Sequence, residues 1–319
     1  HKGYIRSDKQ KEDLNDLVLS ELYLIANSSY RSFEANKLHL LFQATYYLNS
    51  GNYKSAIRYY QELINLFNDN QHLILNPPIY YLSAIQGILD SLCIAGLYHE
   101  TPFFLSKLEE LTQNEYSTEF ILHLKTLIYI YKSNSLLQAG NFEQALELRD
   151  KQENELLKKV TSLGLESQLR LYLSFAVLGM YTKDYVQARK YMKKIFSLGK
   201  LFCAFPSYKI ARLVNLLLQA ELGNYDFFEN EIISIKRNIR FEKQTYITEK
   251  LIFKFIQGYP LPSYEKARNK RWLQYQKDIQ KIEQDKYERQ LLKTFDVLAW
   301  IESKLTQRSL ADIFAEKAH

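Results

Sequence analysis

The sequence is poor in residues that interrupt helices and in cysteine. It has only 10 glycines and 6 prolines in 319 residues, which favours helices and excludes a turn-rich β protein. Its two cysteines, Cys93 and Cys203, lie far apart with no histidine or cysteine at ligand spacing. This arrangement excludes a disulfide framework and a structural zinc site. We therefore expect two buried thiols in a protein of the reducing cytoplasm.

Long apolar runs and known catalytic motifs are missing as well. The sequence contains no run of about 18 apolar residues that would cross a membrane, and its start does not resemble a secretory signal. The six histidines form no HExxH pair, and no phosphate-binding loop, nucleophile elbow or dinucleotide-binding glycine pattern occurs. We therefore expect a protein with no catalytic residues, metal or cofactor, and with no membrane partner.

One short phrase returns five times along the chain. Each copy has a small turn residue, then a polar residue, then an aromatic one, and Lys183 takes the place of glycine in the fourth copy. The copies recur at intervals of roughly 40 to 45 residues, a period typical of stacked helical hairpins. The sequence therefore predicts an all-α protein, an α-α superhelix (solenoid) of about five helical hairpins. The five turns lie at residues 50–53, 95–98, 139–142, 183–185 and 222–225.

Composition and periodicity divide the chain into three parts. An amphipathic helix is expected over residues 8–28, and the clearest boundary is the Gly- and Pro-rich stretch 258–262. Beyond that stretch lies one long helical pattern, or two helices, over residues 263–305, which would cap the last repeat. The expected parts are an N-terminal cap (1–32), helical repeats (33–258) and a basic C-terminal helical region (259–319).

The repeats resemble tetratricopeptide repeats. In the first unit the resemblance is carried by Leu40, Ala44, Tyr47, the turn 51–53, Ala56, Tyr60 and Leu63. The third unit carries it in Tyr129, Ser133, Leu136, Gly140, Phe142 and Ala145, and the fourth in Tyr172, Ala176, Tyr185, Ala188 and Met192. Small residues such as Ala44 and Ala56 let two helices approach closely. The second and fifth units depart from the pattern, with Leu89, Thr101, Leu216 and Phe228 at small positions.

The resemblance implies an adaptor that binds a protein or peptide in a concave groove lined by the first helix of each hairpin. The positions six and two residues before each turn would line that groove, with Tyr181 as an aromatic anchor. For each position the alternative is ordinary solvated surface. The predicted groove residues are Thr45, Asn49, Asp90, Asn134, Gln138 and Tyr181, joined by Ile94, Val177, Leu217 and Glu221 at equivalent positions.

A basic cluster follows the 258–262 stretch. Lys266, Arg268, Lys270 and Arg271 lie beside Trp272 and Tyr275, an arrangement that could bind phosphates and stack bases. It could equally attract an acidic protein. Acidic residues are interspersed at helical spacing further along, as on a solvated face laced with salt bridges. They are Asp278, Glu283, Asp285 and Glu288.

Three functions remain open at this point. The first is a non-catalytic scaffold for a protein or peptide. The second is a peptide-sensing regulatory module of a larger regulator, which requires an effector domain that this sequence does not contain. The third is a helical repeat that binds nucleic acid through the basic cluster. Finally, Leu310, Ile313 and Phe314 have the spacing of a groove-binding helix, so the tail is expected in its own groove or in a neighbour's.

Overall fold

A computed structural model of the chain describes residues 12, 32–73, 76–199, 205–241 and 246–317. Fifteen α-helices and three short 3-10 helices, with no strand, make up the regular structure of these residues. The prediction of an all-α protein is thereby confirmed. The helix expected over residues 8–28, and with it nearly all of the N-terminal cap (1–32), lies outside the described residues apart from Glu12 and Ser32.

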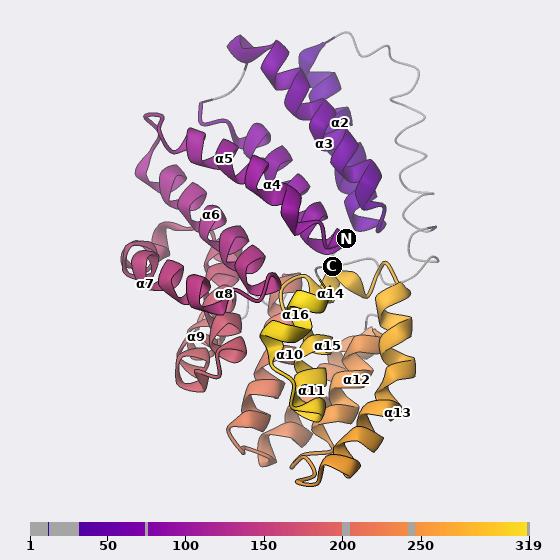
Figure 1. The fold of residues 1–319 in the computed structure, drawn as a ribbon. Helices are drawn as coiled ribbons and strands as arrows, with labels where there is room; N and C mark the ends of the chain where they lie inside the picture. Colours follow the sequence, from indigo (N-terminus) through magenta and orange to yellow (C-terminus); the bar gives the residue numbers. More distant parts are fainter. Residues whose placement is uncertain (1–11, 13–31, 74–75, 200–204, 242–245, 318–319) are drawn as a thin grey trace. The chain divides into compact units, whose positions relative to one another are not determined.

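Five successive helix pairs follow the predicted hairpins (Figure 1). They are α2 (Phe33–Asn49) with α3 (Tyr53–Asp69), α4 (Ile79–Ala95) with α5 (Thr101–Leu111), α6 (Thr118–Gln138) with α7 (Phe142–Lys158), α8 (Leu165–Tyr181) with α9 (Tyr185–Ser197), and α10 (Pro206–Glu221) with α11 (Asp226–Phe241). Five further helices complete the chain: α12 (Ile247–Ile256), α13 (Glu265–Gln284), α14 (Arg289–Leu292), α15 (Val297–Thr306) and α16 (Leu310–Lys317).

The predicted turn residues share one backbone conformation. Gly51, Gly96, Gly140 and Gly223 have φ of 76°, 78°, 74° and 73°, and Lys183 has φ of 62°. This left-handed region is open to glycine but costs other residues about 1–2 kcal/mol. The assignment of Lys183 as the fourth copy's equivalent of glycine is therefore confirmed. Two of the following helices start with a side-chain cap, because Asn52 and Asp184 accept hydrogen bonds from the N–H groups of Ser55 and Gln187.

The chain forms two compact structural units, each of them larger than a single repeat. The described residues up to Leu124 belong to one unit, and those from Lys125 onward belong to the other, so that the division falls within α6. In the first unit α3 packs against both α2 and α4. In the second unit α8 packs on α9, and α10 packs on both of them. The chain then continues from α10 to α12, α13, α15 and α16, each of which packs against the one before it.

The small residues of the repeats are fully buried where paired helices approach. Ala44 and Ala56 are 0% exposed in the first unit, as are Ala176 and Ala188 in the second. The larger residues at the divergent positions are buried too, Leu89, Thr101 and Leu216 completely and Phe228 to 7% exposure. The apolar faces predicted from the sequence therefore form the core of each unit.

The C-terminal region does not form one long helix. Helix α13 ends at Gln284, and Asp285 has an extended backbone with φ of −89° and ψ of 118°. The polar stretch over residues 283–290 provides too few apolar side chains to continue the buried stripe, so the chain turns here. The short helices α14, α15 and α16 follow. Residues 285–317 are called the C-terminal segment below.

One glycine of the first unit is required by packing. A Cβ atom at Gly87 of α4 would lie 2.2 Å from the ζ carbon of Tyr60, whose side chain is 4% exposed. We expect Gly87→Ala to lower the free energy of unfolding by about 1–3 kcal/mol, the usual cost of overpacking. Denaturant unfolding followed by circular dichroism measures this loss. Gly164→Ala is the control, because a Cβ there meets no atom within 4 Å. Equal stability of the two variants would contradict the prediction.

Candidate functional site

Two predicted groove residues of the first unit, Thr45 and Asp90, influence one tyrosine, Tyr60. Thr45 of α2 is exposed, and its hydroxyl lies 3.5 Å from the hydroxyl of Tyr60. Burial raises the pKa of Tyr60, the hydrogen bond with Thr45 lowers it, and the charge of Asp90 on α4 raises it. Asn49 donates a hydrogen bond of 2.8 Å to the carbonyl of Thr45. Thr45 of α2 and Asp90 of α4 thus both act on Tyr60, and they come from two neighbouring first helices.

The same face of α2 carries exposed apolar side chains that sequence reasoning missed. Leu38 and Phe42 are 53% and 38% exposed. They precede Thr45 by seven and three residues, which places them on its side of the helix. That spacing was the available signal. Leu38, Phe42, Thr45 and Asn49 form a stripe, named here the α2 stripe, that is apolar at one end and polar at the other.

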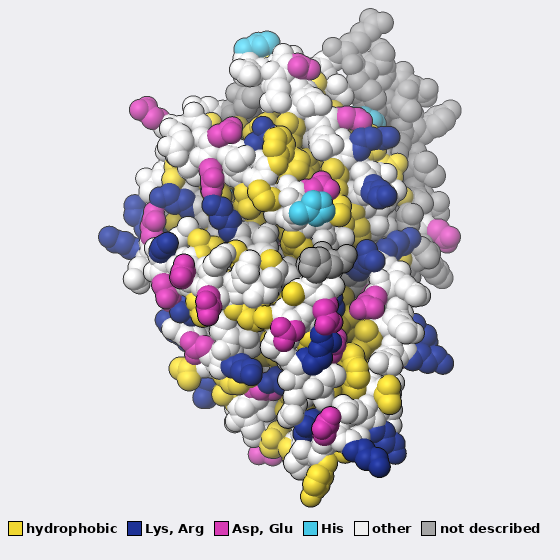
Figure 2. Space-filling model, in the orientation of Figure 1, with side chains coloured by type: hydrophobic (Ala, Val, Ile, Leu, Met, Phe, Trp, Pro, Cys, Tyr) yellow, Lys and Arg dark blue, Asp and Glu magenta, His cyan; other side chains and the backbone are white. Residues whose placement is uncertain are grey.

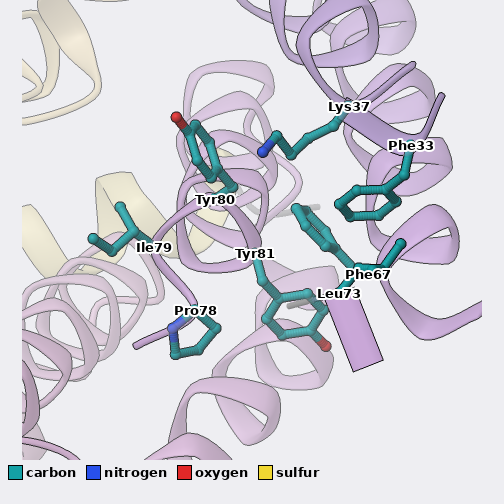
Figure 3. Close-up of a pocket in the computed structure, with 8 residues that line it drawn as sticks. All are labelled: Phe33, Lys37, Phe67, Leu73, Pro78, Ile79, Tyr80 and Tyr81. Carbon is teal, nitrogen blue, oxygen red and sulfur yellow. The ribbon is translucent and has the colours of Figure 1, made fainter. Parts of the chain in front are cut away.

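A small, shallow aromatic pocket lies between α2, α3 and the start of α4 (Figure 3). The ammonium group of Lys37, whose side chain is 4% exposed, lies 4.2 Å from the ring centre of Tyr80 and 2.5 Å from Glu34 Oε2. The chain thus supplies its own cation to these aromatic rings. The pocket joins the first two hairpins and is poorly suited to a cationic ligand. Its lining residues are Phe33, Lys37, Phe67, Leu73, Pro78, Ile79, Tyr80 and Tyr81.

In the second unit the predicted groove positions contact the C-terminal segment. The side-chain amide of Asn134 donates to the carbonyl of Lys293 at 3.2 Å. Glu221 Oε2 lies 2.5 Å from the ammonium group of Lys304. Val177 and Leu217 are buried, as is Ile94 in the first unit, and Gln138 is half-buried. Asn134 and Glu221 therefore contact the chain's own C-terminal residues, and Leu217 lies near Leu291 and Phe295.

Tyr181 was expected to be an exposed aromatic anchor, and it is buried instead, with 3% exposure. Its ring stacks on Phe295 at 5.0 Å between centroids. Its hydroxyl accepts a hydrogen bond of 2.6 Å from the N–H group of Asp296. The prediction failed because residues more than a hundred positions later in the chain cover this side chain. Tyr181 anchors a segment of its own chain.

A polar cluster secures α15 to the repeats. Glu221 accepts hydrogen bonds from the hydroxyls of Tyr185 and Tyr259, at 2.6 and 2.9 Å, in addition to its contact with Lys304. Burial raises the pKa of both tyrosines, and the charge of Glu221 and its hydrogen bonds raise it further. Both hydroxyls therefore stay protonated as donors. We call these four residues the Glu221 cluster.

A second carboxylate connects the C-terminal segment to α12. The oxygens of Glu288 accept hydrogen bonds from the N–H groups of Ile247 and Thr248, at 2.5 and 3.0 Å, in the first turn of that helix. Burial raises the pKa of Glu288, and these hydrogen bonds oppose the rise without cancelling it. A side chain some forty residues away in the sequence thus provides the cap that the start of α12 needs.

The tail lies against its own chain. Leu310, Ile313 and Phe314 of α16 are 7%, 2% and 0% exposed. The Phe314 ring packs edge-on against Tyr181 at 5.4 Å and Phe142 at 6.1 Å. Of the two places expected for the tail, its own groove or a neighbour's, the structure shows the first.

The basic cluster is smaller at the surface than its sequence indicates. Lys266 and Lys270 are exposed, but Arg268 is only 8% exposed and donates to the carbonyls of Pro262 and Ser263 at 3.1 and 2.6 Å. Arg271 is half-buried and donates to the carbonyl of Gly258 at 2.8 Å. Two of the four cations therefore hold the 258–263 stretch to α13. Tyr275, expected as a stacking surface beside them, is 1% exposed. On the face shown in Figure 2, positive and negative side chains are intermixed.

Among the residues that the structure describes, no group of three or more His, Cys, Asp or Glu side chains is placed to hold a metal ion. Within the same residues, every helix is too short or too polar to cross a membrane. Comparison with known proteins finds no match to this chain, whether among protein-family models, curated proteins or solved structures.

Proposed function

We propose that the chain is a non-catalytic scaffold of the cytoplasm that binds a protein or peptide segment. In this proposal, tetratricopeptide-like hairpins stack as an α-α superhelix, and the first helix of each hairpin faces the bound segment. The observation that supports it is the position of the C-terminal segment. That segment lies against α6, α8 and α10 through Asn134, Tyr181 and Glu221, three positions that the repeat pattern assigns to a groove.

The contacts with the C-terminal segment illustrate how such a groove recognises a chain. Asn134 donates a hydrogen bond to a backbone carbonyl, and the hydroxyl of Tyr181 accepts one from a backbone N–H. Glu221 binds the ammonium group of a lysine side chain. Two of these contacts involve main-chain groups and could therefore form with a bound segment of almost any sequence, whereas the third requires a cation. Rigid aromatic surface beside main-chain hydrogen bonds is a common combination in peptide recognition.

The α2 stripe is our candidate for the site that takes a partner. Leu38 and Phe42 offer exposed apolar surface, and Thr45 and Asn49 add polar groups along the same face. A segment with two neighbouring apolar side chains followed by polar residues complements this order. Apolar contacts at the centre of an interface usually carry most of the affinity, so Leu38 and Phe42 are its expected anchors.

A displayed peptide library tests this function. Peptides selected on the full chain should bind the Leu38→Asp/Phe42→Asp double variant about tenfold or more weakly, because the charges remove both apolar anchors. Phe103→Asp is the matched control, since Phe103 is 60% exposed but lies on the second helix of its hairpin. Fluorescence anisotropy with one selected peptide measures the three affinities. The proposal fails if no peptide is selected or if the double variant binds like the control.

A further inference from the structure

We infer that the surface beneath α16 is a second binding site, which takes an amphipathic helix from a partner protein and which α16 fills in its absence. The site is built from Phe142, Tyr181, Phe295, Asp296 and the turn at Gly140. The partner helix carries aliphatic residues at positions i and i+3, an aromatic ring at i+4 and a cation at i+7. These residues are distinct from the α2 stripe, but they include Tyr181 of the predicted groove, so this inference rests on the proposed function and extends it to a second site.

Aromatic rings form the centre of this surface. Phe142 stacks on Tyr181 with 6.1 Å between centroids and 17° between planes, and Tyr181 stacks on Phe295 at 5.0 Å. Phe314 of α16 meets Phe142 and Tyr181 nearly at right angles, at 86° and 78°. Edge-to-face contacts of this kind stabilise the packing beyond the burial of each ring. The site therefore selects an aromatic residue at this point of a helix.

The turn at Gly140 sets how closely a helix can approach. A Cβ atom at Gly140 would lie 2.9 Å from the carbonyl oxygen of Ala311 and 3.3 Å from its Cα. Real Cβ atoms do not come that close to backbone atoms. The helix thus lies directly on the bare backbone of the turn with a small residue, Ala311, against it. A partner helix needs a small residue at the same point, one position after its first aliphatic residue.

The far end of the site is acidic. The ammonium group of Lys317 lies 2.8 Å from Asp296 Oδ2, and Glu283 and Glu302 add negative charge around it. The pKa of Lys317 is raised, since these acidic charges outweigh the opposing effect of burial. Asp296 also accepts a hydrogen bond from the N–H of Ala299, which holds the carboxylate in place. A helix with a cation three residues beyond its aromatic ring matches this charge.

Helix α16 is suited to leave the site. It is only eight residues long, and an isolated helix of that length is marginal in water. It follows Gln307, whose left-handed φ of 60° is unfavourable for any residue other than glycine. Its ion pair between Arg308 and Glu316 is exposed, so solvent screens it. As a tethered ligand it acts at an effective concentration near the millimolar range, which a partner has to overcome.

A peptide experiment tests the inference on the full chain. The probe is a fluorescent peptide of residues 306–319 with the natural sequence. It should bind the Phe314→Asp chain about tenfold or more tightly than the unchanged chain, because the altered α16 no longer fills the site. Adding Gly140→Ala to Phe314→Asp should abolish binding. Adding Gly223→Ala should not, because Gly223 has the same left-handed φ but open space around it. Binding to neither chain, or binding that ignores Gly140→Ala, overturns the inference.

Hydrogen exchange gives a second readout that does not depend on the folding of the Phe314→Asp chain. In the chain with only Gly140→Ala, the amides of residues 310–317 should exchange about tenfold or more faster than in the Gly223→Ala chain, because the clash with Ala311 expels α16. Circular dichroism confirms that both chains are folded. Equal exchange in the two variants would show that α16 does not lie on the Gly140 turn, and the inference would then be rejected.

Discussion

Replacing Tyr181 by alanine is expected to lower the free energy of unfolding by about 3–5 kcal/mol, the usual cost of removing a buried aromatic side chain. Tyr181 is 3% exposed, stacks on Phe295 and Phe142, and accepts the hydrogen bond of the Asp296 N–H group. The change leaves a cavity beneath both rings and an unpaired buried N–H. Denaturant unfolding followed by circular dichroism and by tryptophan fluorescence measures the loss, since Trp300 lies within the same unit.

Two further variants separate packing from hydrogen bonding. Tyr181→Phe keeps the ring but removes the acceptor of the Asp296 N–H, so it should cost about 1–3 kcal/mol. Thr45→Ala, at an exposed groove position six residues before Gly51, should change stability by less than about 0.5 kcal/mol. If Tyr181→Ala proves as mild as Thr45→Ala, then Tyr181 lies at the surface and the C-terminal segment does not cover it.

Replacing Lys304 by methionine is expected to cost about 2–4 kcal/mol of unfolding free energy, because it leaves the Glu221 carboxylate buried without its cation. The side chains of Lys304 and Glu221 are 20% and 11% exposed, so solvent screens this pair only weakly. The hydroxyls of Tyr185 and Tyr259 still donate to Glu221 and limit the loss. Thermal and denaturant unfolding of the full chain measure it.

An exposed ion pair of the same unit supplies the control. Lys254 and Asp278 are 4.0 Å apart with side chains 54% and 37% exposed, and Lys254→Met should change stability by less than about 1 kcal/mol. The double variant Lys304→Met/Glu221→Gln removes the buried charge as well and should regain part of the loss. Equal effects of Lys304→Met and Lys254→Met would show that α15 is not held by the Glu221 cluster.

The hairpins could be predicted because their signals are local. A left-handed turn residue, a polar cap and an aromatic follow one another within four residues, and the pattern identified even Lys183 as a turn position. Small residues such as Ala44 and Ala56 were identified as helix contacts for the same reason, since their spacing from the turn fixes their face of the helix. Each of these predictions depends on a few residues that are neighbours in sequence.

The contacts by which the C-terminal segment covers the hairpins of the second unit could not be predicted from neighbouring residues in the sequence. Tyr181 is buried by Phe295, and Asn134 meets the carbonyl of Lys293, through contacts between residues that share no periodicity. The basic cluster was misjudged for a related reason. A count of charges does not show that Arg268 and Arg271 donate hydrogen bonds to the carbonyls of Pro262, Ser263 and Gly258. The sequence predicted the secondary structure around these residues, but not what their side chains contact.

The path of the C-terminal segment has a consequence for how the protein is made. The bonds from Lys293 to Asn134, from Asp296 to Tyr181 and from Lys304 to Glu221 join residues 159, 115 and 83 positions apart. The first hairpins make mostly local contacts and can fold while synthesis continues. In the second unit, Tyr181 and its neighbouring aromatic rings stay uncovered until residues 285–317 have left the ribosome. During translation, we expect a chaperone to bind mainly at this exposed apolar face.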